Sequence, residues 1–187
     1  MSARPIIRSN KGMEAAKEES GGLYFHKPQT EVEFIPSGCT MLDCVLGGGW
    51  PIGRIVNIVG DRSTGKTLLA MEAIANLFLK YDHGWAQYDE AESAFDPEYA
   101  AALGIPIRRV EIKNDFDTIE AVFNDLDKIT RKGPGLYIID SLDALSDAAE
   151  MGRGISEGSF GAAKAKKMSE LFRRLVRKLA RLKICLI

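Results

Sequence analysis

Residues 60–67 read Gly-Asp-Arg-Ser-Thr-Gly-Lys-Thr, which matches the pattern G-x-x-x-x-G-K-[ST] of a phosphate-binding loop. Such a loop works between a strand and a helix, because its backbone N–H groups and the positive end of the helix must face the same anion. Both flanks fit this requirement. Residues 55–59 are apolar and rich in β-branched side chains, which predicts a buried strand, and residues 68–74 continue at helical spacing. The segment therefore predicts a strand, loop and helix unit around which the fold is built.

The residue types of this loop indicate the phosphates of a nucleotide and Mg²⁺ as ligands. The glycine-bearing turn would surround the β-phosphate, Lys66 would reach the β- and γ-phosphates, and the hydroxyl of Thr67 would ligate Mg²⁺. The alternative is an ordinary strand-to-helix turn with a chance lysine. The expected nucleotide-binding residues of the loop are Gly60, Asp61, Arg62, Ser63, Thr64, Gly65, Lys66 and Thr67.

A second candidate ligand for the metal follows another apolar segment. Residues 136–139 read Leu-Tyr-Ile-Ile and lead directly into Asp140. Because ligands collect at the carboxyl ends of parallel strands, Asp140 and the phosphate loop are expected to meet at one edge of a sheet. Read alone, Asp140 has an alternative interpretation as a helix N-cap or turn residue. Read with the loop, it is predicted to hold the water shell of Mg²⁺.

Composition limits the classes of protein that this chain can belong to. With 187 residues, 45% of them hydrophobic, the chain can bury one core, and it has no apolar run long enough to cross a membrane. A net charge of −1 means that any nucleic-acid contact must come from a local basic patch. The three cysteines form no C-x-x-C pair and no even set, and no secretory signal opens the chain, so we expect a cytoplasmic protein.

The order of segments predicts an α/β fold. Residues 1–34 are polar and punctuated by Gly and Ser, which indicates an N-terminal arm or linker, and residues 35–187 carry the globular pattern. Ser37 is the expected N-cap of a short helix that ends at Leu46, and Asp117 is the expected start of a later one. The other expected strands are 84–88, 109–112, 135–139 and 183–187, alternating with helices at 68–81, 97–103, 117–131 and 162–181. This alternation predicts a mainly parallel sheet with crossover helices.

Several of these segments together resemble one family, the RecA-type recombinases. The resemblance rests on residues 36–43, 46–54, 96–100 and 139–145, together with the phosphate loop, all in the family's order. Within it, Tyr88-Asp89 and residues 164–173 are most similar to the phage recombinases of the UvsX kind. The similarity covers about residues 35–187 and reaches the arm only by position.

The resemblance implies a RecA-like P-loop NTPase core with a mainly parallel sheet flanked by helices. It also implies a DNA-dependent ATPase that binds single-stranded DNA as a filament and pairs it with homologous double-stranded DNA. After this pairing, such a protein would promote strand exchange with ATP hydrolysis, as part of DNA recombination and repair. Subunits would self-associate into a filament or ring with ATP between them, in the cytoplasm of a bacterium or a phage-infected cell, and no membrane partner is expected.

Hydrolysis requires a carboxylate that orients or deprotonates water beside the γ-phosphate. The candidates lie in the segment 88–92, where strand alternation puts Glu90 and Glu92 on one face and Asp89 on the other. Counting back from Asp96 places the family's glutamate at Glu92, whereas counting forward from Tyr88 places it nearer Glu90. Glu92 is the preferred catalytic residue and Glu90 the second choice, and the one that is not catalytic would belong to a solvated acidic turn.

The resemblance also implies that Asp96 and Tyr99 contact the adenine, Tyr99 by stacking. From the residues alone, another interpretation stays open. Asp96 precedes Pro97 in the pattern of a helix N-cap followed by proline at the first helical position, and Tyr99 would then only pack against its neighbours.

DNA contact is expected from residues 150–161 and the helix that follows. Four glycines and no apolar periodicity mark this segment as a loop, in which Arg153 would meet phosphates and Phe160 would contact a base. Lys164, Lys166 and Lys167 then cluster at a helix N-terminus, an unfavourable place for cations unless an anion neutralises them. The alternative is a solvated helix face, which we favour for the basic residues from Arg173 onward, opposite a core face of Met168, Leu171, Phe172, Leu175, Val176 and Leu179.

The end of the chain departs from the family pattern. Residues 183–187 begin a strand that in the family leads to a polar γ-phosphate sensor and a second DNA-binding loop. This predicts a core truncated at its C-terminus, either a fragment or a natural short form. Three functions remain open: a recombinase with ATPase activity, a nucleotide-gated recombinase paralogue or mediator with little hydrolysis, and a RecA-fold motor such as a ring helicase.

Overall fold

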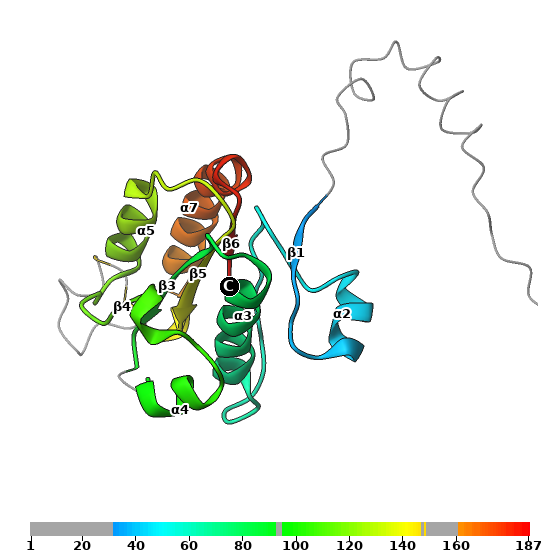
Figure 1. The fold of residues 1–187 in the computed structure, drawn as a ribbon. Helices are drawn as coiled ribbons and strands as arrows, with labels where there is room; N and C mark the ends of the chain where they lie inside the picture. The colour runs from blue at the N-terminus through cyan, green and yellow to red at the C-terminus, as the bar shows by residue number, and fades with distance from the viewer. Residues whose placement is uncertain (1–31, 93–94, 147, 149–160) are drawn as a thin grey trace, which may run out of the picture. The chain divides into compact units, whose positions relative to one another are not determined.

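In the part of the chain that the structure describes, the centre is a parallel sheet of four strands, seen in a computed structural model (Figure 1). The structure describes residues 32–92, 95–146, 148 and 161–187. The strands stand in the order β4, β3, β5, β6, and every neighbouring pair is parallel. Their bounds are Trp85–Glu90 for β3, Val110–Lys113 for β4, Gly135–Asp140 for β5 and Ile184–Leu186 for β6. The expected α/β fold with a mainly parallel sheet is confirmed.

Helices cover both faces of this sheet (Figure 1). On one face lie α3 (Lys66–Lys80) and α4 (Pro97–Ala102), and on the other lie α5 (Ile119–Lys128) and α7 (Gly161–Leu182). Each face has its own apolar core, and strand alternation assigns each side chain to one of them. Tyr88 packs in the core under α3, whereas Trp85 and Tyr137 pack with α5 and α7. The result is a helix, sheet, helix arrangement.

A short hairpin precedes the sheet. β1 (Phe34–Ile35) pairs antiparallel with β2 (Trp50–Pro51), and α2 (Thr40–Leu46) lies between them in sequence. The carboxylate of Glu33 accepts a hydrogen bond from Lys183 at 2.5 Å, and Lys80 donates to the backbone oxygen of Phe34 at 2.7 Å. These contacts tie the hairpin to α3 and to the residue just before β6. In the described residues, no helix is long and apolar enough to span a bilayer.

Two expected helix caps are wrong. Ser37 does not cap α2, because its hydroxyl bonds instead to the backbone N–H and C=O of Cys39, closing a turn before the helix starts. Cys39 is the N-cap residue, without a side-chain hydrogen bond. Asp117 does not cap α5. Thr118 does so, since its hydroxyl lies one residue nearer and accepts a hydrogen bond from the third N–H of the helix.

The apolar segment before the phosphate loop joins the sheet over a shorter length than expected. Ile55 forms a parallel bridge with Leu186, and the N–H of Val56 donates to the oxygen of Leu186 at 2.7 Å. In the described residues no pairing follows Val56, and Val59 is 84% exposed. The prediction of a buried strand over residues 55–59 is therefore wrong for its second half, where the described residues supply no neighbouring strand.

α7 turns one apolar side toward the sheet. Leu175, Leu179 and Leu182 are buried in the core shared with α5, and Arg173 is exposed, as expected for a solvated face. Val176 is 46% exposed, so its expected place in the core is wrong. The reason is angular: Val176 is one helical step, about 100°, from Leu175 and three residues beyond Arg173, which places it on the solvated side.

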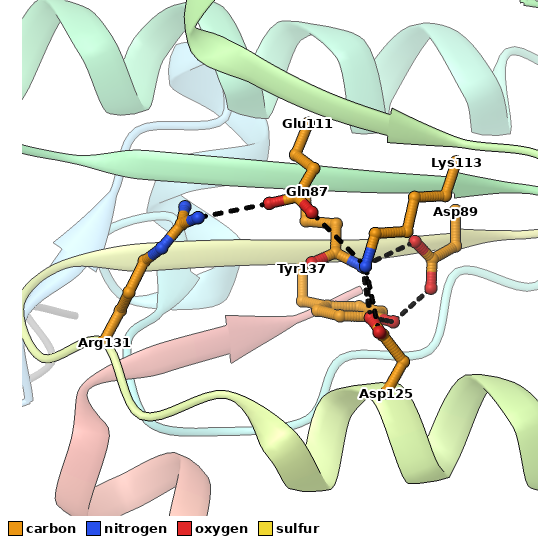
Figure 2. A network of polar contacts seen from close by, with 7 residues as sticks. All are labelled: Gln87, Asp89, Glu111, Lys113, Asp125, Arg131 and Tyr137. Atoms are coloured by element: carbon orange, nitrogen blue, oxygen red, sulfur yellow. Dashed lines mark hydrogen bonds and ion pairs between the residues drawn. The ribbon is translucent and has the colours of Figure 1, made fainter.

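A network of polar side chains lies between the sheet and α5 (Figure 2). The hydroxyl of Tyr137 donates to Asp89, and the amide of Gln87 donates to Asp89 at 2.8 Å and to Asp125 at 2.7 Å. Lys113 pairs with Asp125 at 2.8 Å. The network joins three strands to α5 and comprises Gln87, Asp89, Glu111, Lys113, Asp125, Arg131 and Tyr137.

The two central carboxyl groups of this network differ in pKa. Burial of Asp89, which is 2% exposed, raises the pKa of its carboxyl from 3.8 to about 6, against the hydrogen bonds from Tyr137 and Gln87. For Asp125, burial acts in the same direction, but hydrogen bonds, above all from Lys113, outweigh it and lower the pKa. At neutral pH Asp89 is therefore ionised, although its buried surroundings favour the neutral acid.

Replacing Asp89 with asparagine is expected to remove one pH-dependent contribution to stability. Because the pKa of Asp89 is higher in the folded state, its contribution is complete below about pH 3.8 and is lost as the pH rises through about 6. The difference in free energy of unfolding between wild type and Asp89→Asn should thus change by about 2–3 kcal/mol across this window, in favour of the variant at high pH. Urea unfolding at pH 4.5, 6 and 7.5 measures it, and a pH-independent difference would contradict the pKa assignment.

Candidate functional site

The phosphate loop, Gly60 to Thr67, leads into the first turn of α3. Gly65 is the N-cap residue and has φ of 91°, a left-handed conformation that glycine adopts without strain. The ammonium group of Lys66 donates hydrogen bonds to the backbone oxygens of Gly60 at 3.0 Å and Asp61 at 2.8 Å. The loop therefore curls around the charged group of its own lysine, and its residues 60–64 are exposed to solvent.

Asp140, at the end of β5, lies against the first turn of α3. Its Oδ2 accepts a hydrogen bond from Thr67 Oγ1 at 2.7 Å and one from the hydroxyl of Tyr88 at 2.6 Å. These two donors occupy both lone pairs of Oδ2, while Oδ1 accepts no hydrogen bond from any residue that the structure describes. The structure thus brings together two residues, Thr67 and Asp140, that are 73 positions apart in the sequence.

The free oxygens of this pair fit Mg²⁺. The Thr67 hydroxyl donates its hydrogen bond to Asp140, so the lone pairs of its oxygen remain available to a metal ion. Both lone pairs of Asp140 Oδ1 are also available. Mg²⁺ is a hard cation that takes oxygen ligands and usually retains several waters. Thr67 would ligate the ion directly, and Asp140 would hold one of its waters.

The two candidate glutamates lie in different surroundings. Glu92 is exposed and its Oε1 accepts a hydrogen bond from Ser141 Oγ at 2.7 Å, so it lies beside the residue that follows Asp140. Glu90, on the same face of β3 as Tyr88, is 9% exposed, and its Oε1 accepts from the backbone N–H of Phe95 at 2.6 Å. Glu90 therefore holds the chain segment that enters α4, while Glu92 stands at the edge of the sheet where the phosphate loop lies.

Asp96 and Tyr99 lie at the start of α4. Asp96 is the N-cap residue, and its Oδ1 accepts hydrogen bonds from the N–H groups of Glu98 at 2.9 Å and Tyr99 at 3.1 Å. The capping interpretation of Asp96 is confirmed. Tyr99 is 47% exposed, which leaves part of its side chain accessible.

The basic residues expected to contact DNA are partly engaged within the protein. Lys164 donates to the backbone oxygen of Leu145 at 2.6 Å, and Lys167 forms an ion pair with Glu120 of α5. Lys166 is exposed. Arg153 and Phe160 fall outside the described residues.

Sequence reasoning did not assign roles to Tyr88 and Ser141. Strand alternation could have indicated the contact of Tyr88 with Asp140. Tyr88 and Glu90 share one face of β3, and Glu90 lies opposite Asp140 in the register of β3 and β5. Burial and the hydrogen bond to Asp140 raise the pKa of Tyr88, so its hydroxyl remains a donor over the whole physiological range. No sequence pattern indicates the bond between Ser141 and Glu92, because it depends on how the chain turns after both strands.

Comparison with known proteins agrees with this geometry. The family model described as the RecA N-terminal domain matches residues 19–187. The chain is 38% identical to Protein RecA of Crocosphaera subtropica over 151 residues, which is 80% of this chain and 41% of the relative. It is 39% identical to Protein RecA of Thermosynechococcus vestitus over 146 residues, 78% of this chain and 40% of the relative.

The chain spans about two fifths of the length of these curated relatives. The match begins at residue 19 and includes the phosphate loop, Asp140 and the residues of α7. Since a family model covers most of the sequence and the parallel sheet carries the loop and Asp140 at one edge, this chain belongs to the RecA recombinase family.

Proposed function

We propose that this chain is the ATP-binding core of a recombinase that hydrolyses ATP when bound to DNA. The observation that carries the proposal is the hydrogen bond between Thr67 of the phosphate-loop helix and Asp140 at the end of β5, 2.7 Å long. It leaves one carboxylate oxygen and the hydroxyl lone pairs free at the carboxyl edge of a parallel sheet, where such folds bind nucleotides. The relatives named Protein RecA support the same activity.

Each residue of the site then has a role in binding or hydrolysis. The loop N–H groups and Lys66 would hold the phosphates. Thr67 and Asp140 would hold Mg²⁺, which when bound would supply positive charge beside the phosphate oxygens. Glu92 orients the attacking water and accepts its proton, and Ser141 fixes the rotamer of Glu92 through the 2.7 Å hydrogen bond. The exposed ring of Tyr99 stacks on the adenine.

The wider activity is part of the same proposal. The protein binds single-stranded DNA as a filament, pairs it with homologous duplex and promotes strand exchange in the cytoplasm of a bacterium or a phage-infected cell. Tyr88-Asp89 and the segment 164–173 support a position near the phage UvsX-like recombinases. DNA contact comes from Arg153, Phe160 and the lysines at the start of α7.

Salt dependence of DNA binding tests the role of these lysines. Replacing Lys164, Lys166 and Lys167 together with alanine is expected to weaken single-stranded DNA binding equally for all sequences. It should also flatten the slope of log K against log salt by about 0.7 for each of the three ammonium groups that neutralises a phosphate. Lys166→Ala alone should give one such step, because this exposed side chain is ready to meet a phosphate. Fluorescence anisotropy with one short oligonucleotide, which holds few subunits, measures both quantities.

A matched control lies on the same helix. The ammonium group of Lys178 donates to the backbone oxygen of Asp127. Lys178→Ala is therefore expected to leave the slope unchanged. An unchanged slope in the triple variant would mean that the three lysines do not contact phosphates and form only a solvated helix face. DNA contact would then depend on Arg153 and Phe160.

A further inference from the structure

The hydroxyl of Tyr88 is a second donor to the carboxylate that we assign to Mg²⁺. Tyr88 lies in β3, is 1% exposed, and donates to Oδ2 of Asp140 at 2.6 Å from the strand next to the one that carries Asp140. Thr67 donates to the same oxygen at 2.7 Å from α3. Two donors from different elements therefore fix the carboxylate plane of Asp140.

This double contact determines which oxygen faces the metal. A carboxylate held by one donor can rotate about its terminal torsion, which is broad for aspartate. With Oδ2 bound on two sides, Oδ1 is the oxygen left for a water of Mg²⁺. Groups that hydrogen-bond to a metal-binding carboxylate orient it in this way, and their removal usually weakens metal binding.

The ring of Tyr88 also reaches the segment that leads to the proposed adenine contact. It packs on Phe95 with ring centroids 5.0 Å apart, and Phe95 is the residue before Asp96, the cap of α4. The backbone N–H of Phe95 is held by Glu90, two residues after Tyr88 on the same face of β3. A single buried side chain thus contacts both the metal-side carboxylate and the start of the segment that carries Tyr99.

We infer that Tyr88 is a positioning residue that orients Asp140 for Mg²⁺ and, through Phe95, aligns the metal side of the nucleotide site with its adenine side. The inference rests on the proposed function, because it needs a Mg²⁺-nucleotide complex at this edge of the sheet. It assigns to Tyr88 no contact with the nucleotide itself.

The test compares two tyrosines of the same sheet. Tyr88→Phe removes only the hydroxyl and keeps the ring on Phe95. Tyr137→Phe makes the same change one strand away, where the hydroxyl donates to Asp89 on the opposite face. Binding of a fluorescent ATP analogue is followed while Mg²⁺ is titrated. Tyr88→Phe should raise the Mg²⁺ concentration for half-maximal binding by about 10-fold, with binding in EDTA unchanged, and Tyr137→Phe should match the wild type.

A double-mutant cycle with Asp140→Asn then tests whether Tyr88 acts through Asp140. If it does, adding Tyr88→Phe to Asp140→Asn should cause no further shift of the Mg²⁺ titration. The inference would be overturned if the Mg²⁺ titration of Tyr88→Phe were identical to that of the wild type, or if both tyrosine variants shifted equally. The proposed function would still stand in either case, provided that the wild type binds the nucleotide normally. A wild-type chain that binds no nucleotide at any Mg²⁺ concentration would overturn both.

Discussion

Replacing Lys66 with alanine is expected to weaken ATP binding by about 10- to 100-fold, because charge-assisted hydrogen bonds to the phosphates are removed. Turnover should fall by at least about 10²-fold, since the charge that stabilises the transferring phosphoryl group is also removed. In the structure the ammonium group of Lys66 is hydrogen-bonded to the backbone oxygens of Gly60 and Asp61 within the loop. Binding of a fluorescent nucleotide and release of phosphate in the presence of single-stranded DNA measure the two effects.

Stability separates this role from a purely structural one. The two hydrogen bonds of Lys66 lie in an exposed loop, so Lys66→Ala should change the free energy of unfolding by about 1 kcal/mol or less. Lys128→Ala, an equal change of charge at the exposed end of α5, should alter neither binding nor turnover. Wild-type ATP binding by Lys66→Ala, combined with reduced stability, would show that the lysine only braces the loop.

Replacing Glu92 with glutamine is expected to reduce turnover by about 10² to 10⁴ while nucleotide binding persists, the usual share of a positioned general base. Glutamine keeps the size of the side chain and can still accept the hydrogen bond from Ser141, but it cannot take a proton from water. Steady-state phosphate release, with nucleotide binding measured on the same preparation, separates the two quantities.

Glu90→Gln serves as the matched control for Glu92→Gln. The carboxylate of Glu90 is buried and bonded to the N–H of Phe95, so its replacement should affect stability more than turnover. If Glu90→Gln abolishes turnover and Glu92→Gln does not, the assignment of the base is reversed. If the wild type binds nucleotide but releases little phosphate, and neither variant changes this, the protein is a nucleotide-gated recombinase paralogue or mediator with little hydrolysis.

Local patterns predicted most of the sheet and its helices. Alternating apolar strands and amphipathic helices gave β3, β4, β5, α3 and α7 to within two residues at either end. They did so because side-chain periodicity is a property of each segment by itself. The caps were less predictable: Asp117 and Thr118 are both good N-cap residues, and only the backbone position of the first turn of α5 selects Thr118.

Exposure was predicted less well where it depends on a neighbour. Residues 55–59 have the composition of a buried strand, yet Val59 is 84% exposed, and in the described residues no strand pairs with it. Val176 was expected in the core, yet it is 46% exposed, because it lies one helical step from Leu175 at the edge of the apolar side of α7. Composition describes a residue, whereas burial depends on what lies next to it.

The sequence by itself determined the phosphate loop and its place between a strand and a helix, the parallel α/β fold, and the presence of Asp140 at a strand end. These features depend on residues close together in the chain, where backbone propensity and side-chain periodicity act directly. Only the tertiary structure decided that Thr67 and Tyr88 share one oxygen of Asp140, that Ser141 holds Glu92, and that Glu90 is bonded to Phe95. Such contacts join strands and helices that are distant in sequence. Their geometry follows from strand register and helix placement, which no single segment of the chain contains.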